Sequence, residues 1–166
     1  VAITELVKNA YDADASGVTI EFHGVTAPGG EIVIRDDGCG MDLEALLQLW
    51  MEPAGTSKAG RGRERTARRR RGLGEKGVGR FAVAKLARQL ELISRCRGAT
   101  TEILATFDWD LFDSEEEMLS DVKNRWEMRP AEEITTHGTV LRMKGLRSRW
   151  TERMFRRLAT RLARLC

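Results

Sequence analysis

The stretch Glu5–Asp14, ELVKNAYDAD, constrains the fold most, because its periodicity is that of a helix with two unlike sides. At about 100° per residue, an apolar stripe forms on one side and polar groups gather within about 60° on another. The stripe comprises Ile3, Leu6, Ala10 and Ala13, and the polar group comprises Glu5, Asn9 and Asp12. A chain with this helix must bury the stripe against a second layer and keep its polar side open. Oxygen donors of this kind can hold a metal ion and a water.

The chain has 166 residues, of which 42% are hydrophobic and 32% charged, so we expect one globular domain with a substantial core. It contains no run of 18 or more apolar residues and no signal-peptide pattern, which predicts a cytoplasmic protein outside the membrane. Its three cysteines are widely spaced, without a CxxC pair, and are expected to be free thiols. Both ends lie inside amphipathic patterns, so we expect a piece of a longer protein.

Apolar runs predict strands at Gly17–His23 and Glu31–Arg35, joined into a hairpin by a turn rich in proline and glycine. Helical spacing predicts helices over Asp42–Trp50, with Asp42 as the N-cap, and over Val78–Leu90. Further strands are expected at Gln89–Ser94, Thr100–Phe107 and Thr139–Met143. Hairpin-connected strands beside several helices indicate an α+β sandwich, with helices on one face of a mixed, mainly antiparallel sheet.

The hexapeptide Asp36–Met41, DDGCGM, follows the second strand and places a carboxylate where it can point into a cleft. Gly38 and Gly40 lack a Cβ, so the backbone can turn sharply and approach a flat ligand closely. An aspartate beside them can accept a hydrogen bond from an exocyclic amine such as adenine N6. A plain turn explains the hexapeptide alone equally well.

A second glycine-rich stretch, Gly72–Phe81, leads directly into a predicted helix. Unpaired N–H groups and the positive end of a helix dipole at such a junction suit phosphate groups. The stretch has neither the spacing of a Walker A loop nor a preceding strand, so a flexible hinge explains it equally well.

The net charge of +3 conceals two basic segments. The first is an arginine run, Arg61–Arg71, inside an aperiodic segment from Ala54 to Lys76. A solvated mobile loop, a phosphate contact from Arg61 or Arg63, and salt-sensitive nucleic-acid binding all remain open for it. The second, Arg147–Arg164, carries apolar residues at helical spacing and is predicted to be a packing helix rather than a nucleic-acid reader.

Taken in order, the acidic and amide-bearing helix, the DDGxGM turn and the GxxGxG helix start resemble the N, G1 and G2 boxes of the GHKL ATPases. This superfamily includes DNA gyrase B, the ninety-kilodalton heat-shock chaperone, histidine kinases and MutL. His137–Leu141 is similar to the GT-containing strand that completes the family's nucleotide pocket. The segments Gly55–Lys58 and Gly74–Ala82 look closest to prokaryotic members of the chaperone or MORC branches.

The resemblance implies a Bergerat-type two-layer sandwich that binds ATP. An ATP-binding domain would span residues 1–146, with its N-terminal part missing, and residues 54–76 would form its ATP lid. Residues 147–166 would form a basic amphipathic helix, which could lead into a further domain.

On the first helix, the resemblance implies that Glu5 is the general base that deprotonates the attacking water. Asn9 would be the ligand of Mg2+, and Asp12 would orient a further water. Lys8, between them, is expected to be solvated.

At the DDGxGM turn, the resemblance implies that Asp36 reads adenine. Gly38, Gly40 and Met41 would shape the wall of the pocket. Thr139 would share the water that bridges the carboxylate and the base.

At the third box, the resemblance implies that Gly77, Val78 and Gly79 offer backbone N–H groups to the β- and γ-phosphates. Lys76 would neutralise charge beside them.

The function implied is Mg2+-dependent ATP hydrolysis, in which nucleotide binding and lid closure drive a conformational change in attached C-terminal domains. A homodimer formed on ATP binding is a further implication. Hydrolysis by the fragment is expected to be slow, because in gyrase-like members a lysine or arginine at the γ-phosphate comes from a following domain. Two alternatives remain: a nucleotide-dependent binding module that does not hydrolyse ATP, and the catalytic domain of a histidine kinase, which the absence of a phosphoacceptor helix disfavours.

Overall fold

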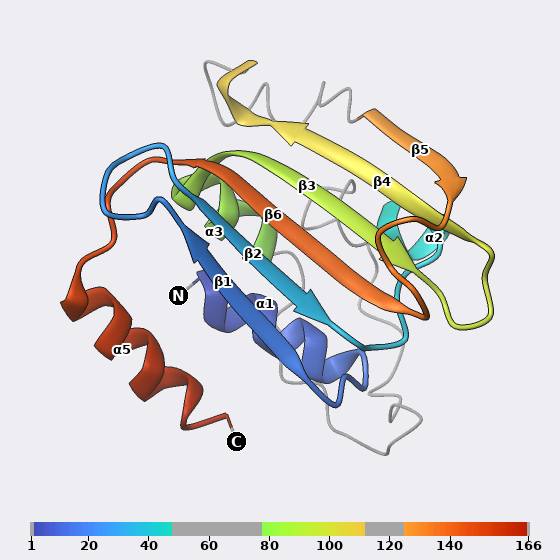
Figure 1. The fold of residues 1–166 in the computed structure, drawn as a ribbon, viewed down its shortest axis with the longest axis horizontal. Coiled ribbons are helices and arrows are strands. Elements are labelled where there is room, and N and C mark those ends of the chain that lie inside the picture. Colours follow the sequence, from blue (N-terminus) through green and yellow to red (C-terminus); the bar gives the residue numbers. More distant parts are fainter. Residues whose placement is uncertain (1, 48–77, 112–124, 166) are drawn as a thin grey trace.

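The computed structural model describes residues 2–47, 78–111 and 125–165 and contains one six-stranded sheet (Figure 1). The strand order is β1-β2-β6-β3-β4-β5, and each neighbouring pair is antiparallel. The strands are β1 (Val18–His23), β2 (Glu31–Asp36), β3 (Ala87–Arg95), β4 (Thr101–Asp108), β5 (Arg125–Pro130) and β6 (Gly138–Leu146). The last strand in the sequence, β6, is therefore central in the sheet.

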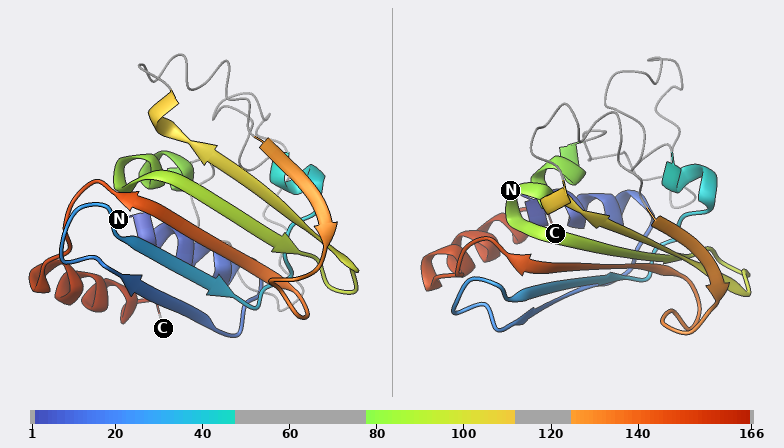
Figure 2. Two further views of the ribbon diagram at one scale, coloured as in Figure 1. Left: turned by 45° about the horizontal axis from the view of Figure 1, so that its top comes forward. Right: turned by 90° about the horizontal axis from the view of Figure 1, so that it is seen from above.

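Helices cover one face of this sheet. They are α1 (Ala2–Asp12), α2 (Leu43–Leu46) and α3 (Val78–Leu86), with a short 3-10 helix, η2 (Trp109–Leu111), after β4. Seen edge-on, α1, α2 and α3 lie on the same side, and α5 (Glu152–Leu162) lies at the edge near β1 (Figure 2). The predicted two-layer α+β sandwich is confirmed, and every described strand pair is antiparallel.

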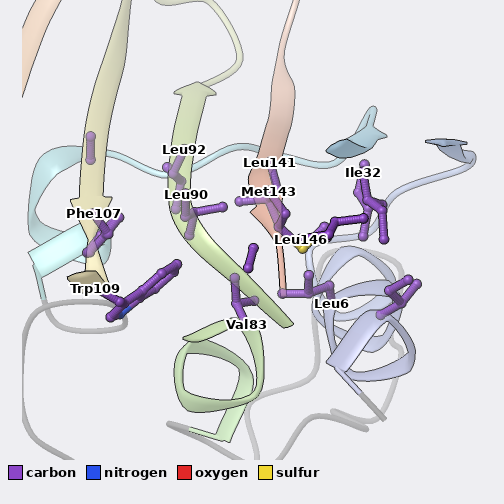
Figure 3. Close-up of a cluster of buried hydrophobic side chains, with 14 of the residues drawn as sticks. Leu6, Ile32, Val83, Leu90, Leu92, Phe107, Trp109, Leu141, Met143 and Leu146 are labelled. Carbon is purple, nitrogen blue, oxygen red and sulfur yellow. The ribbon is translucent and has the colours of Figure 1, made fainter. Parts of the chain in front are cut away.

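The core lies between α1, α3 and the sheet (Figure 3). Leu6 of α1 and Val83 of α3 are 2% and 0% exposed and pack on the apolar face of the central strands. From the predicted stripe of the first helix, Ile3, Leu6 and Ala10 are buried, whereas Ala13 lies just beyond the helix and is half-buried. The amphipathic pattern therefore identified the buried side of α1.

Most predicted elements are confirmed. The hairpin pairs β1 with β2, and Oδ1 of Asp42 accepts the N–H of Ala45 at 2.8 Å as the N-cap of α2. The helix predicted over Asp42–Trp50 is described only to Leu47, because residues 48–50 lie outside the described part.

The helix predicted over Val78–Leu90 is wrong beyond Leu86. Ala87 and Leu90 are spaced as on a helix, but both lie in β3, where they pair with Leu146 and Met143 of β6. Burial against the central strand overrides a local helical period.

The strand β5 was not predicted, because few of its side chains are buried and its sequence therefore lacks a run of apolar residues. Trp126 and Met128 on this edge strand remain 43% and 56% exposed.

The basic helix is shorter than predicted and begins at Glu152. The residues before it bond to the turn after β1 and to the end of α3, since Trp150 N donates to Val25 O at 2.7 Å and Arg147 N donates to Leu86 O at 3.0 Å.

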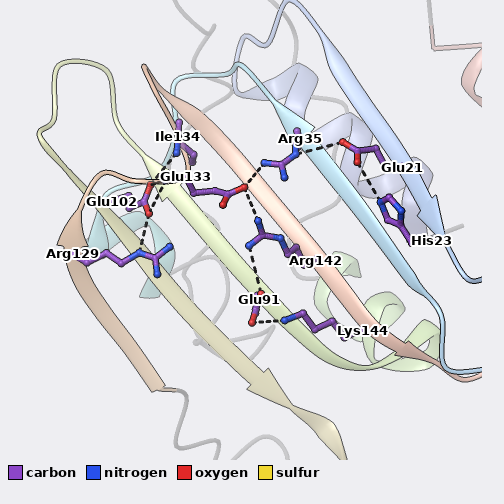
Figure 4. Close-up of polar contacts among 10 residues, drawn as sticks. All are labelled: Glu21, His23, Arg35, Glu91, Glu102, Arg129, Glu133, Ile134, Arg142 and Lys144. Carbon is purple, nitrogen blue, oxygen red and sulfur yellow. Dashed lines mark hydrogen bonds and ion pairs between the residues drawn. The ribbon is translucent and has the colours of Figure 1, made fainter.

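The other face of the sheet carries a network of ion pairs, and no helix within residues 2–47, 78–111 and 125–165 covers it (Figure 4). Glu133 Oε1 lies 2.6 Å from both Arg35 Nη1 and Arg142 Nη2, and Glu91 pairs with Arg142 and Lys144. Alternating charges let this face meet water without a second covering layer.

Candidate functional site

Three neighbouring strands bring polar side chains together at one end of the sheet. Asp36 of β2 lies opposite Thr139 of β6, and Ser94 of β3 lies opposite the same threonine. Because side chains alternate along a strand, these three share the face that is covered by α1. Asp36 and Thr139, which were predicted from motifs far apart in the sequence, therefore meet in one place.

Asp36 is a carboxylate held in a partly dry environment. Its Oδ1 accepts the backbone N–H of Gly38 at 2.9 Å, and the backbone N–H of Thr139 also bonds to this carboxylate. Burial raises the pKa of Asp36 to about 6, against the lowering effect of these two hydrogen bonds. A carboxylate kept in such surroundings is a strong acceptor for a ligand that supplies an N–H donor.

Asp37, the next residue, has a structural role. Its carboxylate accepts the N–H groups of Ser16 and Gly17 at 2.7 and 2.8 Å, as well as the hydroxyl of Ser16. The hydroxyl of Ser16 is the main cause that lowers the pKa of Asp37 to about 2. Asp37 therefore fastens the loop after α1 to the end of β2, whereas Asp36 faces the interior.

Ser94 is a site residue that the sequence analysis missed. Its side chain is 0% exposed, and its Oγ lies 3.1 Å from Thr139 Oγ1 and accepts the N–H of Met41 at 2.8 Å. It thus joins the DDGxGM turn to the central strands. The sequence contains one indication of this role: Ser94 follows Leu90 and Leu92 at alternate positions, so it lies on the buried face of β3. The local sequence does not indicate which residues Ser94 contacts.

Two glycines of the site are required by close backbone approach. Gly40 has φ +72°, and a Cβ there would lie 2.0 Å from Arg95 O. Gly138 has φ +135°, and a Cβ there would lie 2.0 Å from Asp36 O. Neither position tolerates another residue without movement of the backbone, so these glycines allow the DDGxGM turn to lie against β3 and the start of β6 to lie against β2.

On α1, Glu5 and Lys8 form an ion pair with 2.8 Å between Oε1 and Nζ. Their side chains are 15% and 25% exposed, so the expectation of a solvated Lys8 is wrong. Asn9 is exposed and Asp12 is half-buried on the same helix. Among the described residues no group of three or more His, Cys, Asp or Glu is placed to hold a metal ion.

The glycine-rich box is described only in part. Val78 and Gly79 open α3, which packs beside α1. Lys76, Gly77 and the predicted lid over residues 54–76 lie outside the described residues, as does the arginine run at 61–71.

A buried clamp holds the loop that leads into β6. Glu102 is 0% exposed, and its oxygens accept the N–H groups of Glu133 and Ile134, both at 3.1 Å, and Arg129 Nε at 2.9 Å. Burial alone would raise the pKa of Glu102, but these hydrogen bonds outweigh it and lower the pKa. The held loop carries His137, whose Nδ1 donates to Gly38 O at 2.7 Å. Glu102 therefore supports the DDGxGM turn through this loop.

We expect Glu102→Gln to lower the free energy of unfolding by about 3 kcal/mol at neutral pH, because it leaves Arg129 and a backbone N–H without their anionic partner. A folded-state pKa below the unfolded one stabilises above about pH 4.5, and this contribution is lost as the pH falls through the folded value. Urea unfolding at pH 7 and pH 4 should show the difference shrinking at low pH. Glu127→Gln, on the exposed neighbouring strand, is the matched control, and an equal loss in both variants would contradict the clamp.

The sheet ends in the half-buried carboxylate of Asp36, beneath a helix that carries a carboxylate and an amide. This is the architecture expected of an ATP-binding domain with N, G1 and G2 boxes. The chain belongs to the family described as histidine kinase-, DNA gyrase B-, and HSP90-like ATPase, whose model matches residues 1–139. It is thus an ATP-binding module of the GHKL superfamily, and that prediction is confirmed.

Among curated proteins, the chain is 40% identical over 100 residues to the DNA mismatch repair protein MutL of Paramagnetospirillum magneticum. The match covers 59% of this chain and 15% of that protein. It is 41% identical over 99 residues to MutL of Thermus aquaticus, covering 58% of this chain and 16% of the relative. The matched region is therefore a small part of these relatives, and they do not bear out the finer expectation of a chaperone-like or MORC-like branch.

Solved structures show the same fold at low identity. The N-terminal domain of a DNA repair protein aligns with a TM-score of 0.56 and 18% identity, over 98% of this chain and 38% of that one. The Aquifex aeolicus MutL ATPase domain, complexed with ADP, aligns with a TM-score of 0.51 and 14% identity, over 97% of this chain and 44% of that one. Among the described residues, no helix has the length and apolar character needed to cross a bilayer.

Proposed function

We propose that the chain binds ATP with Mg2+ and hydrolyses it, with adenine at Asp36 and the phosphates between α1 and the start of α3. The observation that carries this is the half-buried Asp36 carboxylate, which two backbone N–H groups hold in place beside Thr139 and Ser94. Once ionised, this carboxylate can accept the exocyclic amine of adenine, because each carboxylate oxygen offers two lone pairs. The same pocket would offer guanine, which has a carbonyl at that position, only a repulsive contact.

In this proposal Glu5 takes a proton from water as the water oxygen bonds to the γ-phosphorus. The bond from that phosphorus to the β–γ bridging oxygen breaks, which gives ADP and inorganic phosphate. Mg2+ would neutralise charge on the phosphate oxygens. Asn9 suits this ion, since Mg2+ keeps waters and phosphate oxygens and needs few protein ligands, and its exposed amide lies one turn from Glu5. Asp12 would orient a further water beside the ion.

Residues outside the described part complete the proposal. Lys76 and Gly77, with Val78 and Gly79, bind the phosphates, and residues 54–76 close over them as a lid. Closure shifts attached C-terminal domains and favours a homodimer. The curated MutL relatives are much longer than this chain, which is consistent with such domains.

A second candidate function is nucleotide-dependent binding without hydrolysis. One observation favours it: Lys8 Nζ lies 2.8 Å from Glu5 Oε1, so the proposed base is already engaged in an ion pair. Bound nucleotide would then stabilise a conformation that partners recognise, and it would dissociate without being hydrolysed.

Titration calorimetry with ATP and Mg2+ tests the binding that both functions share. We expect a heat of association for ATP and a loss of at least about tenfold in affinity for GTP, because the carboxylate meets a carbonyl instead of an amine. A folded sample without measurable ATP binding, or one that prefers GTP, would refute the proposed site.

A further inference from the structure

The helix α5 presents a continuous arginine surface that the nucleotide site does not use. Its outward residues border one hollow that also includes Glu152 and Thr160. The arginines of this surface are Arg153, Arg156, Arg157, Arg161 and Arg164. The first four lie on α5, where at about 100° per residue they span an arc of about 140°, and Arg164 lies just beyond the end of the helix; all five are exposed. Between Arg147 and Arg164 the sequence contains one acidic residue, Glu152, which pairs with Arg156 at 2.6 Å.

The apolar side of α5 is already occupied. Phe155 packs on Phe22 of β1 with 4.8 Å between ring centroids, and on Trp150 with 5.3 Å. Leu158 also packs against the core. A basic amphipathic helix that binds a lipid surface must insert its apolar side into the bilayer. In α5 that side is committed to the domain, so the arginine surface is available for a polyanion in water.

The chemistry of the surface fits a phosphodiester backbone. The guanidinium group presents a planar fork that matches phosphate oxygens and keeps its charge at any physiological pH. Proteins that hold single strands stack bases on exposed aromatic rings, whereas Phe155 and Trp150 pack against Phe22 and each other. This favours a duplex, in which bases are already stacked.

The dimensions favour DNA over RNA. A helix about 10–12 Å wide fits the major groove of B-form DNA, about 12 Å across, and arginines on a broad arc then reach phosphates on both walls. The major groove of A-form RNA is too narrow for this. We infer that the arginine surface of α5 binds the backbone of double-stranded DNA without sequence preference.

Fluorescence anisotropy with a labelled 20-base-pair duplex of mixed sequence tests this inference on the whole chain. We expect binding that weakens steeply with salt. In the triple variant Arg153→Gln, Arg157→Gln and Arg161→Gln, affinity should fall on the order of tenfold or more at low salt, and the slope of log K against log salt should flatten by about 2–3. A control with the same charge change, Lys85→Gln, Arg88→Gln and Arg97→Gln, should keep the wild-type slope.

The competing partners are outcomes of the same experiment. Tighter binding of duplex RNA, or equal binding of vesicles with anionic lipid, would overturn the inference. So would wild-type DNA binding by the α5 variant together with loss of binding when Arg68–Arg71 are replaced. Because the arginine surface of α5 takes no part in the proposed nucleotide site, ATP binding measured in parallel should be the same in the wild type, the α5 variant and the Lys85, Arg88 and Arg97 control, so failure here is distinct from failure of the proposed function.

Discussion

Asp36→Asn is expected to weaken ATP binding on the order of a hundredfold while the fold persists. The reason is geometric: Oδ1 must accept Gly38 N at 2.9 Å, so the amide nitrogen of Asn occupies the place of Oδ2 and points a donor at the donor of adenine. Calorimetry with ATP measures the loss.

The wild-type pH profile carries the same information. Because the pKa of Asp36 is about 6, protonation below that pH puts an O–H where the acceptor should be. ATP affinity should fall by up to about tenfold per pH unit below pH 6, and the Asn variant should lack this dependence. A flat wild-type profile between pH 5 and pH 7 would count against Asp36 as the acceptor.

Stability should move in the opposite direction. A carboxylate whose folded pKa lies above the unfolded value of 3.8 disfavours the folded state once it ionises, so this contribution to stability is lost as the pH rises through about 6. At pH 7.5 the Asn variant should therefore unfold at the same temperature as the wild type or a higher one. Asp37→Asn is the matched control: it loses the contacts to Ser16 and Gly17, so it should lower stability and keep ATP affinity within a few fold.

Glu5→Gln is expected to lower the rate of ATP hydrolysis by about 10²–10⁴-fold, because the amide cannot accept the proton of the attacking water. ATP affinity should change little, since the adenine contacts lie at the other end of α1. Phosphate release under saturating ATP and Mg2+ measures the rate. Glu152→Gln, which removes an exposed glutamate of α5, should leave it unchanged.

The same pair of measurements separates the two candidate functions. A wild-type rate no higher than that of Glu5→Gln, with ATP binding intact in both, would exclude hydrolysis and leave the nucleotide-dependent binding module. Lys8→Gln then shows whether the ion pair at 2.8 Å restrains the base: a rise in rate would mean that Lys8 must release Glu5 before the reaction.

Local chemistry explains what could be predicted from the sequence. The stripe of α1 and the hairpin of β1 and β2 repeat with helix and strand periods, and Asp42 caps its helix through its own side chain. The structure of each of these segments depends on neighbours within a few residues. The superfamily was identified for a similar reason, since each motif is contiguous.

The features that could not be predicted from the sequence depend on pairing between strands that are distant in the chain. Ser94 and His137 reach the turn after β2 only because β3 and β6 assemble beside it, and no local pattern specifies those neighbours. The clamp at Glu102 depends on residues 27 and more positions away. The roles assigned to Glu5, Asn9 and Asp36 stay predictions until the variants above are measured.

The place of β6 has a consequence for how the molecule is made. This strand is the last of the sheet to leave the ribosome, yet it joins β2 to β3 at the middle. Until about residue 146 has emerged, the nascent chain holds two separate fragments of sheet, and Asp36 has neither Thr139 nor Ser94 beside it. If nucleotide binds at Asp36 as proposed, it can be captured only after β6 has emerged and paired, and its binding then stabilises the assembled sheet and not the two separate fragments.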